Sequence, residues 1–340
     1  MHRMLPLWLP GFVVVLSTVS ALPLGTQAAV QRSPPANTWI NETGTLANMA
    51  SQCGNLTLLS PVPRSDTIIA GVAGRGLWTN SRGSTWVQLA GSDKIVNRPS
   101  WIVYDPARPA VFWESGIYGS GGIYQTTDRG ISFRRLGSIV HNDYVSVDFT
   151  DPERRTLLAG GHEQSQTVYQ STDGGQTWTN IGESLPDKGT SSHPLIIDSN
   201  TYVVSAEGVG IYRTTNAGAS WRRVSAQGPV GPPLVTAKGA IYWPANGGLL
   251  KSTDAGTTWV HVGKDLHPIH PIELSDGKLV SAGGNRLVIS ADGGSTWVPF
   301  GATLPFSPAG LIYAPGRKAF FIWHFDCRDV VLANAVMAIY

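Results

Sequence analysis

Side chains that can exchange protons are concentrated in the middle of the sequence, between residues 113 and 207. Four of them could take part directly in acid/base catalysis, namely Glu114, Asp143, His162 and Glu163. Cleaving a glycosidic bond needs two carboxyl groups about 5–10 Å apart in different environments. In that chemistry Glu114 or Glu163 would be the proton donor, Asp143 the base or nucleophile, and His162 the group that orients or tunes them.

Aromatic and polar residues of the same stretch suit the binding of a sugar, because aromatic rings such as Trp113 can stack on a sugar ring. The residues predicted to contact a substrate are Trp113, Tyr118, His141, Tyr144, His193 and Glu207. The same loops could instead bind a glycan or a protein without catalysis. His141, Asp143 and His162 could also bind a metal ion, but their spacing matches no compact metal-binding motif. We therefore expect neither a metal nor a cofactor.

The elements that hold these side chains are indicated by an eight-residue motif that recurs through the chain. Its clearest copy, residues 171–178, reads Ser-Thr-Asp-Gly-Gly-Gln-Thr-Trp. The six copies begin at Thr79, Thr126, Ser171, Thr214, Ser252 and Ser290. The first copy is degenerate, with Ser81 in place of the aspartate. Successive copies lie 38 to 47 residues apart, which is close to the period of a four-stranded propeller blade.

The chemistry of the motif is structural. A hydroxyl and a carboxylate two residues apart can accept hydrogen bonds from the amides of a turn. The glycine at the fifth position of each copy can adopt a backbone angle that other residues resist. The third residue of the motif carries a carboxylate or amide in five copies, at Asp128, Asp173, Asn216, Asp254 and Asp292. Each motif follows an apolar strand, so we expect it to form the turn between the third and outermost strands of a blade. Six copies spread around a ring cannot converge on one substrate.

Counting inner strands predicts one blade more than the motifs do. Seven apolar segments can be placed as innermost strands, and the last of them, at Leu311–Tyr313, is followed by strands at Ala319–Trp323 and from Val330 onward. That blade lacks an outer strand, and the N-terminal segment Asn37–Asn41 resembles the outer strand that follows a motif. We therefore predict an all-β fold, a seven-bladed propeller of four-stranded antiparallel blades closed by the N-terminal strand. Cys53 and Cys327 would then lie on one face and form a disulfide that locks the ring.

This register assigns loops to faces. Loops that enter an innermost strand and loops that join the second and third strands share one face, and the motifs occupy the other. All the candidate catalytic and binding residues are predicted to lie on the face without motifs, most of them on blades two to four. Because loops on a rigid scaffold commonly carry function, we expect the site there.

Composition excludes several functions. Charged residues make up only 14% of the 340 residues, and the formal net charge is +2. No run of lysine and arginine could follow a phosphate backbone, so we expect no nucleic-acid partner. The N-terminus has a short apolar stretch followed by small residues, which predicts a signal peptide over residues 1–28. A linker over 29–36 and a single propeller over 37–340 would follow. We expect a secreted, extracellular or periplasmic monomer without a membrane span.

The repeated motif resembles that of the Asp-box, or bacterial neuraminidase repeat, families. These include sialidases, xyloglucanases, the sortilin luminal domain and photosystem II assembly factors. A sialidase needs three converging arginines and an Arg-Ile-Pro motif, for which Asn97-Arg98-Pro99 is a poor match. Xyloglucanases pair two propellers, and sortilin-type domains have ten blades. The photosystem II assembly factors match in length and blade number, and they act by binding a partner.

Two functional hypotheses follow from the sequence. The first is an extracellular carbohydrate-active enzyme, a glycoside hydrolase or lyase, which the clustering of acid/base residues favours. The second is a non-catalytic propeller that binds a glycan or protein partner on the same face. The resemblance indicates the fold and does not choose between them.

Overall fold

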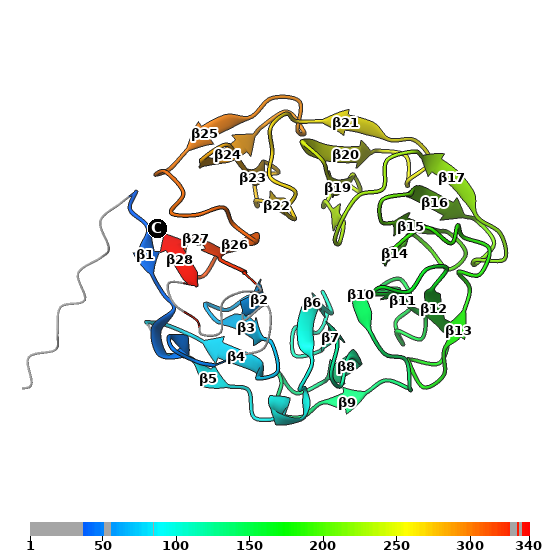
Figure 1. Cartoon of the computed structure of the whole chain (residues 1–340), viewed down its shortest axis with the longest axis horizontal. Coiled ribbons are helices and arrows are strands. Elements are labelled where there is room, and N and C mark those ends of the chain that lie inside the picture. Colours follow the sequence, from blue (N-terminus) through cyan, green and yellow to red (C-terminus); the bar gives the residue numbers. More distant parts are fainter. Residues whose placement is uncertain (1–36, 51–55, 84, 327–331, 333–334) are drawn as a thin grey trace, which may run out of the picture. The chain divides into compact units, whose positions relative to one another are not determined.

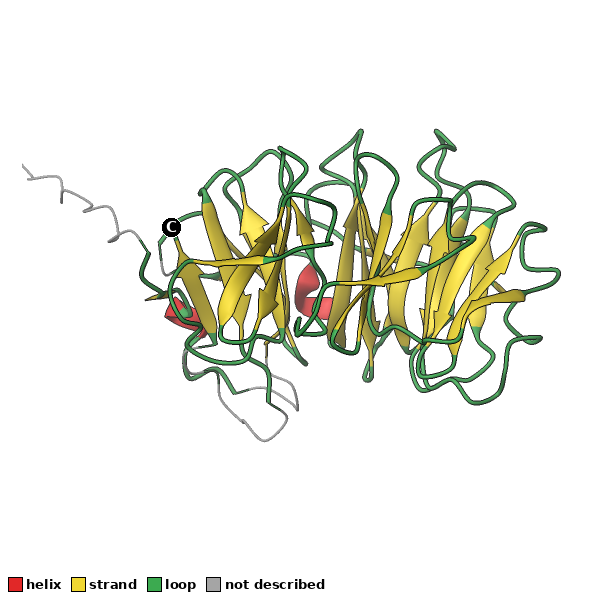
Figure 2. Cartoon of the chain, turned by 90° about the horizontal axis from the view of Figure 1, so that it is seen from above, coloured by secondary structure: helices red, strands yellow, loops and turns green. Residues whose placement is uncertain are grey.

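The computed structural model describes residues 37–50, 56–83, 85–326, 332 and 335–340, all of which belong to one compact unit, Pro34–Tyr340. The predicted signal peptide, the linker and both cysteines, Cys53 and Cys327, lie outside the described residues. Seven four-stranded sheets form a closed ring (Figure 1). Seen edge-on, the strands lie between two faces that carry the loops (Figure 2).

Each blade is an antiparallel sheet whose first strand is innermost. Blade 1 contains β2 (Leu56–Pro61), β3 (Ile68–Val72), β4 (Gly76–Asn80) and β5 (Val87–Gln88). Blade 2 contains β6 (Arg98–Tyr104), β7 (Phe112–Ile117), β8 (Gly122–Thr126) and β9 (Arg134–Arg135). Blade 3 contains β10 (Asn142–Val147), β11 (Leu157–Gly161), β12 (Val168–Ser171) and β13 (Thr179–Asn180). Blade 4 contains β14 (Ser192–Ile196), β15 (Tyr202–Ala206), β16 (Gly210–Thr214) and β17 (Arg222–Ser225).

The remaining blades follow the same plan. Blade 5 contains β18 (Leu234–Val235), β19 (Ile241–Ala245), β20 (Gly248–Ser252) and β21 (Val260–Val262). Blade 6 contains β22 (Ile272–Glu273), β23 (Leu279–Gly283), β24 (Arg286–Ser290) and β25 (Val298–Phe300). Blade 7 contains β26 (Gly310–Ala314), β27 (Ala319–Trp323), β28 (Val336–Ile339) and the N-terminal β1 (Ile40–Asn41). Two short 3-10 helices, η1 (Gly44–Leu46) and η2 (Ser92–Lys94), lie between blades in the chain.

The N-terminal strand closes the ring, as the sequence predicts. In β1, Ile40 pairs with Ala338 and Asn41 with Met337 of β28. The third strand of this blade was expected from Val330 onward, but β28 begins at Val336, and Val330 itself lies outside the described residues. The closure is therefore antiparallel pairing between the two ends of the described chain, and it removes the open sheet edge that a split blade would leave.

Tryptophans at the ends of the motifs join successive blades. Trp178 Nε1 donates a hydrogen bond to the carbonyl oxygen of Leu136 (3.1 Å), and Trp221 Nε1 donates to that of Ile181 (2.9 Å). Trp86 Nε1 makes the equivalent bond, 2.9 Å long, to the carbonyl oxygen of Glu42, which follows β1. The junction between blade 7 and blade 1 therefore uses the same contact as the covalently continuous junctions. Apolar clusters fill the space between neighbouring blades.

The aspartates of the motif are bound within their own turns. Asp173 Oδ1 accepts hydrogen bonds from the Ser171 hydroxyl (2.8 Å) and the Thr177 amide (2.9 Å), and its Oδ2 accepts one from the Thr177 hydroxyl (2.6 Å). The same three contacts recur at Asp128, Asp254 and Asp292. These hydrogen bonds lower the pKa of each of the four carboxyls to about 2.

The turn of blade 1 differs from the sequence alignment that predicted it. In other blades the first residue of the second strand pairs with the first residue of the motif. In blade 1 that partner is Asn80, which pairs with Ile68, so the turn is one residue shorter than expected and Ser81 does not occupy the aspartate position. Asn80 Nδ2 instead holds the turn by donating to the carbonyl oxygens of Gly83 and Thr85, each at 2.8 Å.

Candidate functional site

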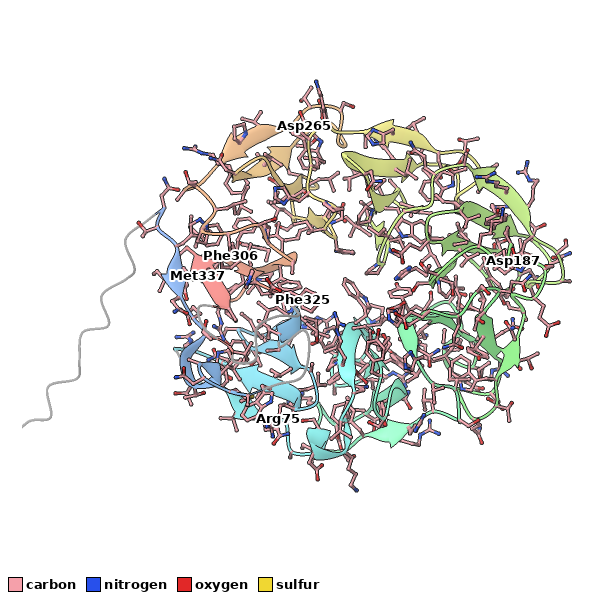
Figure 3. The ribbon with its side chains drawn as sticks, viewed as in Figure 1. Arg75, Asp187, Asp265, Phe306, Phe325 and Met337 are labelled. Atoms are coloured by element: carbon pink, nitrogen blue, oxygen red, sulfur yellow. The ribbon has the colours of Figure 1, made fainter. Side chains whose placement is uncertain are left out.

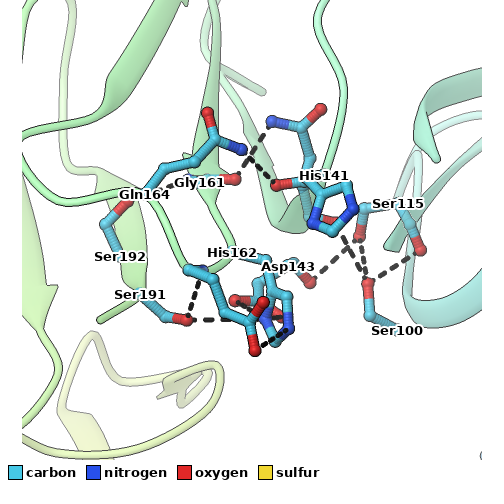
Figure 4. A network of polar contacts seen from close by, with 12 residues as sticks. Ser100, Ser115, His141, Asp143, Gly161, His162, Gln164, Ser191 and Ser192 are labelled. Carbon is cyan, nitrogen blue, oxygen red and sulfur yellow. Dashed lines mark hydrogen bonds and ion pairs between the residues drawn. The ribbon is translucent and has the colours of Figure 1, made fainter. Parts of the chain in front are cut away.

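Loops of blades 2 and 3 bring four predicted site residues into one hydrogen-bonded chain. His162 Nδ1 lies 2.9 Å from Asp143 Oδ2, and His162 Nε2 lies 3.1 Å from the Tyr118 hydroxyl. The Tyr118 hydroxyl in turn donates to Glu163 Oε1 over 3.2 Å. Figure 4 shows His162 between Asp143 and the loop that carries Ser191. The structure therefore brings together three of the four residues expected to act as acids or bases, together with one expected to contact substrate.

Asp143 owes its position to a bulge at the start of the inner strand β10. Blades 1 and 2 carry bulges at the same place, and their extra residues bear hydroxyls. Thr57 donates to the carbonyl oxygen of Pro99 (2.6 Å) and Ser100 to that of Asn142 (3.2 Å), so each joins its strand to the next inner strand. In blade 3 the comparable residue is a carboxylate. Bulges commonly redirect a side chain beside a functional site. Here the change from hydroxyl to carboxylate places an acidic group at one end of the hydrogen-bonded chain of side chains.

Three residues around His162 adopt left-handed backbone angles. Tyr118 has φ 54°, His141 has φ 57° and Glu163 has φ 52°. Such angles are costly for residues other than glycine and often occur where a site is held in a required geometry. The backbone of His162 donates to the carbonyl oxygen of His141 (2.7 Å), and the Tyr118 ring lies edge-on to the ring of His141 with centroids 4.7 Å apart. The loops thus form one rigid cluster.

Asp143 and His162 each favour the charged form of the other. Burial opposes ionisation of both groups, but their mutual hydrogen bond and attraction prevail, so the pKa of Asp143 is lowered and the pKa of His162 is raised. A protonated His162 donates from both ring nitrogens, to Asp143 and to the Tyr118 hydroxyl. Tyr118 then donates to Glu163, and burial together with this bond raises its pKa. Every proton in the chain therefore has an acceptor.

A third carboxyl group lies beside this cluster on blade 4. The backbone amide of Glu207 donates to the carbonyl oxygen of Ser191 (3.0 Å), and the Ser191 hydroxyl lies 3.5 Å from His162 Nδ1. Burial and the charge of Asp143 raise the pKa of Glu207. Ser191 thus contacts the backbone of Glu207 through its carbonyl oxygen and Asp143 through its hydroxyl, and the pKa of Asp143 is lowered while that of Glu207 is raised.

Aromatic rings continue from the cluster across the central channel. His193 is buried, burial lowers its pKa, and its ring lies 6.4 Å from that of Tyr144. Tyr144 lies 6.1 Å from Trp101, which contacts His270 of the opposite side of the ring at 4.9 Å between centroids. Trp101 and His270 also line a channel cavity of about 370 Å³ formed mainly by apolar inner-strand residues.

Two predicted site residues lie elsewhere. Trp113 and Glu114 were expected in a loop at the mouth, but both are inside β7 and fully buried. Trp113 packs between blades 2 and 3. Glu114 lies in register with Ile102 and Tyr124, on the face of blade 2 toward blade 1, and accepts a hydrogen bond from Asn97 Nδ2 (3.1 Å). Burial raises its pKa to about 8. The expected position of Glu114 in a loop at the mouth is therefore wrong, and its side chain is buried within blade 2.

Sequence reasoning missed two residues of the site. Ser191 links Asp143, His162 and Glu207, yet it comes from an ordinary polar loop before β14. Arg98 begins β6, where the charges of Tyr118 and Asp143 act on it. Its guanidinium lies 4.6 Å from the ring centroid of Phe325, which is near the centre of the ring (Figure 3). In the described part of the chain no carboxylate forms an ion pair with Arg98.

Among the described residues no group of three histidine, cysteine or carboxylate side chains is arranged to hold a metal ion. The described part of the chain likewise contains no helix long and apolar enough to cross a bilayer.

Comparison with known proteins relates the chain to Asp-box propellers. No protein-family model matches it. A probable oligoxyloglucan-reducing end-specific xyloglucanase of Neosartorya fischeri is 26% identical over 182 residues, covering 46% of this chain and 21% of the relative. A xyloglucanase of a Paenibacillus species is 30% identical over 161 residues, covering 46% of this chain and 13% of the relative. The chain thus spans only a small part of the curated relatives that it matches.

Solved structures show the same fold at low identity. The xyloglucanase of glycoside hydrolase family 74 from Xanthomonas campestris superposes with a TM-score of 0.56 at 18% identity, covering 89% of this chain and 55% of that one. YCF48 from Cyanidioschyzon merolae gives 0.56 at 13% identity, covering 89% of this chain and 98% of that one. A structure of YCF48 bound to D1 peptide gives 0.53 at 15% identity. The architecture is therefore shared with both an enzyme and a peptide-binding protein.

Proposed function

We propose that this chain, an Asp-box propeller related to xyloglucanases and sharing the fold of YCF48, is an exported glycoside hydrolase that acts on an extracellular glycan. The observation that carries the proposal is the arrangement of Asp143 and Glu207 around Ser191. Pairs of carboxyl groups whose surroundings move their pKa values apart are typical of an acid and a base that act on one bond.

The roles follow from the two environments. Glu207, whose raised pKa favours its protonated form, donates the proton to the departing glycosidic oxygen. Asp143, kept ionised by His162, acts as base or nucleophile on the opposite side of the bond. His162 and Tyr118 orient Asp143 and do not exchange protons with the sugar. Among the residues predicted to bind substrate, Tyr118 is 36% exposed and presents its ring at the mouth.

The sequence relatives suggest the first substrates to test. Both curated relatives are named for activity on xyloglucan or its oligosaccharides, and a β-glucan backbone is a natural candidate for a mouth bordered by Tyr118 and His141. The predicted signal peptide, which lies outside the described residues, would place the protein where such polymers occur. Glu163 is exposed beside Tyr118 and is placed to contact substrate hydroxyls.

The experiment measures release of reducing ends from a panel of neutral and acidic polysaccharides that includes xyloglucan. We expect activity in the wild type, a loss of at least about 100-fold in Asp143→Asn and Glu207→Gln, and unchanged activity in Glu183→Gln, an exposed control on the loop after β13. The pH profile should have an acid limb below the ordinary carboxyl range, set by Asp143, and an alkaline limb above it, set by Glu207. Turnover that survives either substitution would refute the assignment.

The second candidate is binding without catalysis, which the match to nearly the whole length of YCF48 favours. In that case no polysaccharide of the panel would be cleaved, and glycan or peptide binding would persist in Asp143→Asn and Glu207→Gln. Alanine at Tyr118 would weaken binding under either function, so only the carboxylate variants discriminate.

A further inference from the structure

A cavity of about 630 Å³ opens on the motif-bearing face, between blades 1 and 2. It is formed by the loops that join the first and second strands of these blades, by the end of β4 and by the Asp-box turn of blade 2. The candidate active site lies on the other face, so this cavity is a separate site. Its lining contains no aspartate or glutamate.

Three arginines line the cavity. Arg64 donates through Nη2 to the carbonyl oxygen of Pro106 (3.4 Å), and Arg108 donates through Nε (3.0 Å) and Nη2 (2.9 Å) to Asp105 Oδ2. Arg129 is held by its backbone, which has φ 62° and donates to the carbonyl oxygen of Ala110 (3.0 Å). These contacts hold the three arginines at the cavity, and they leave guanidinium N–H donors available for a ligand.

The positive charge of the cluster exceeds its negative charge. Asp105 is the carboxylate that Arg108 contacts, and it also accepts two hydrogen bonds, each 3.1 Å long, from Arg154. Burial opposes its ionisation, but the hydrogen bonds from Arg154 and Arg108 lower its pKa to about 2. One carboxylate therefore serves two guanidinium groups, while Arg64 and Arg129 form no ion pair with any described residue.

Hydroxyl groups complete the polar side of the cavity. The Ser65 hydroxyl donates to Thr67 Oγ1 (2.9 Å), and Thr67 Oγ1 lies 3.3 Å from Ser81 Oγ. Ser81 is available because the turn of blade 1 is one residue shorter than the other motifs and carries no carboxylate at this point. The remaining lining includes Ile69 and Phe112 as apolar walls, and low dielectric on one side strengthens attraction between the arginines and an anion.

From this arrangement we propose that the cavity binds a tetrahedral oxyanion ester carried on a sugar ring, that is, a sulfate or phosphate monoester. Guanidinium groups match the geometry of such oxyanions, and hydroxyls donate to their remaining oxygens. A bare ion would occupy only a fraction of 630 Å³, whereas the apolar walls leave room for the ring that carries the charged group. The proposal is independent of the hydrolase activity.

The test is calorimetric titration of the full chain with glucose 6-sulfate, glucose 6-phosphate and glucose. We expect at least one of the two esters to bind at least tenfold more tightly than glucose. Added salt should weaken that binding. Ser81→Asp places a carboxylate among the arginines and should weaken ester binding at least tenfold. Its isosteric control, Ser81→Asn, should bind within about threefold of the wild type.

Arginine variants give a second measurement that does not depend on Ser81. Arg129→Gln should weaken ester binding at least tenfold, and Arg134→Gln, an exposed arginine of β9, should not. Unfolding curves for each variant identify any that fail to fold. Equal affinity for glucose and both esters, or ester binding that Ser81→Asp and Arg129→Gln leave unchanged, would overturn the proposal. Loss of hydrolase activity in Asp143→Asn would leave ester binding intact, so the two proposals fail separately.

Discussion

Replacing Glu114 with glutamine should remove most of the pH dependence of folding between about pH 5 and pH 8. Glu114 is fully buried, and its pKa rises from the ordinary 4.5 to about 8. A carboxyl whose pKa is higher in the folded protein than in the unfolded chain stabilises the fold fully below its unfolded pKa. That stabilisation is lost as the pH rises through the folded pKa.

The expected magnitude follows from the same values. Each pKa unit is worth about 1.4 kcal/mol, so the wild-type free energy of unfolding should fall by about 3 kcal/mol between about pH 5 and pH 8 on account of this residue. A glutamine cannot ionise. It can still accept the hydrogen bond from Asn97 Nδ2 and can donate to Asn97 Oδ1, a buried atom that has no hydrogen-bond partner among the described residues.

Denaturant unfolding of wild type and Glu114→Gln across this pH range measures the difference, with the exposed carboxyl variant Glu153→Gln as the control. We expect the Glu114→Gln curve to lie above that of the wild type at pH 8 and to be flatter, while the control follows the wild type. Enzymatic activity in Glu114→Gln should stay within about twofold. Parallel pH curves would show that Glu114 is not a buried neutral acid, and a large loss of activity would return it to the site.

Three further predictions concern the scaffold. Trp86→Phe should lower the free energy of unfolding by about 1 kcal/mol, measured by denaturation, because it removes one buried hydrogen bond across the closing junction; no change would mean that the bond to the N-terminal segment contributes nothing. Gly175→Ala should lower the free energy of unfolding by about 1–3 kcal/mol, because φ is 87° and the new Cβ would lie 2.7 Å from a side chain of the preceding blade. Its loss of stability should exceed that of Gly174→Ala, where φ is 74° and the new Cβ meets nothing within 4 Å. Peptide mapping without reductant should recover Cys53 linked to Cys327, and two free thiols in the folded protein would disprove that bridge.

The repeat, together with the count of inner strands, was sufficient to predict blade number, closure and the division of loops between faces. These features depend on period and strand order, which a recurrent turn reveals directly. It also placed Asp143, His162 and Tyr118 on one face, where the structure finds them in contact. No spacing rule could show that they form a single hydrogen-bonded chain, because a bulge and three left-handed residues create that contact.

The errors arose where local sequence hides a boundary. Glu114 lies between a tryptophan and a serine, which is typical of a polar loop, yet β7 continues through it because Asn97 satisfies its carboxyl. The motif at residues 79–86 aligns by its glycine and tryptophan, but β4 continues one residue into it, to Asn80, and the turn is one residue shorter. Both errors are shifts of strand ends, and strand ends depend on tertiary hydrogen bonds more than on composition.

The pairing of β1 with β28 has a consequence for the order of folding. Six blades are made of strands that are close together in the chain, so each can form soon after it is synthesised. The seventh joins Ile40 to Ala338 and must wait for the last residues to appear. Closing a loop of that length costs about 2 kcal/mol more entropy than closing one blade. The N-terminal strand is thus the first strand made and the last to be placed. A circular permutant that begins at blade 1 and carries β1 after β28 should refold faster than the natural order of strands.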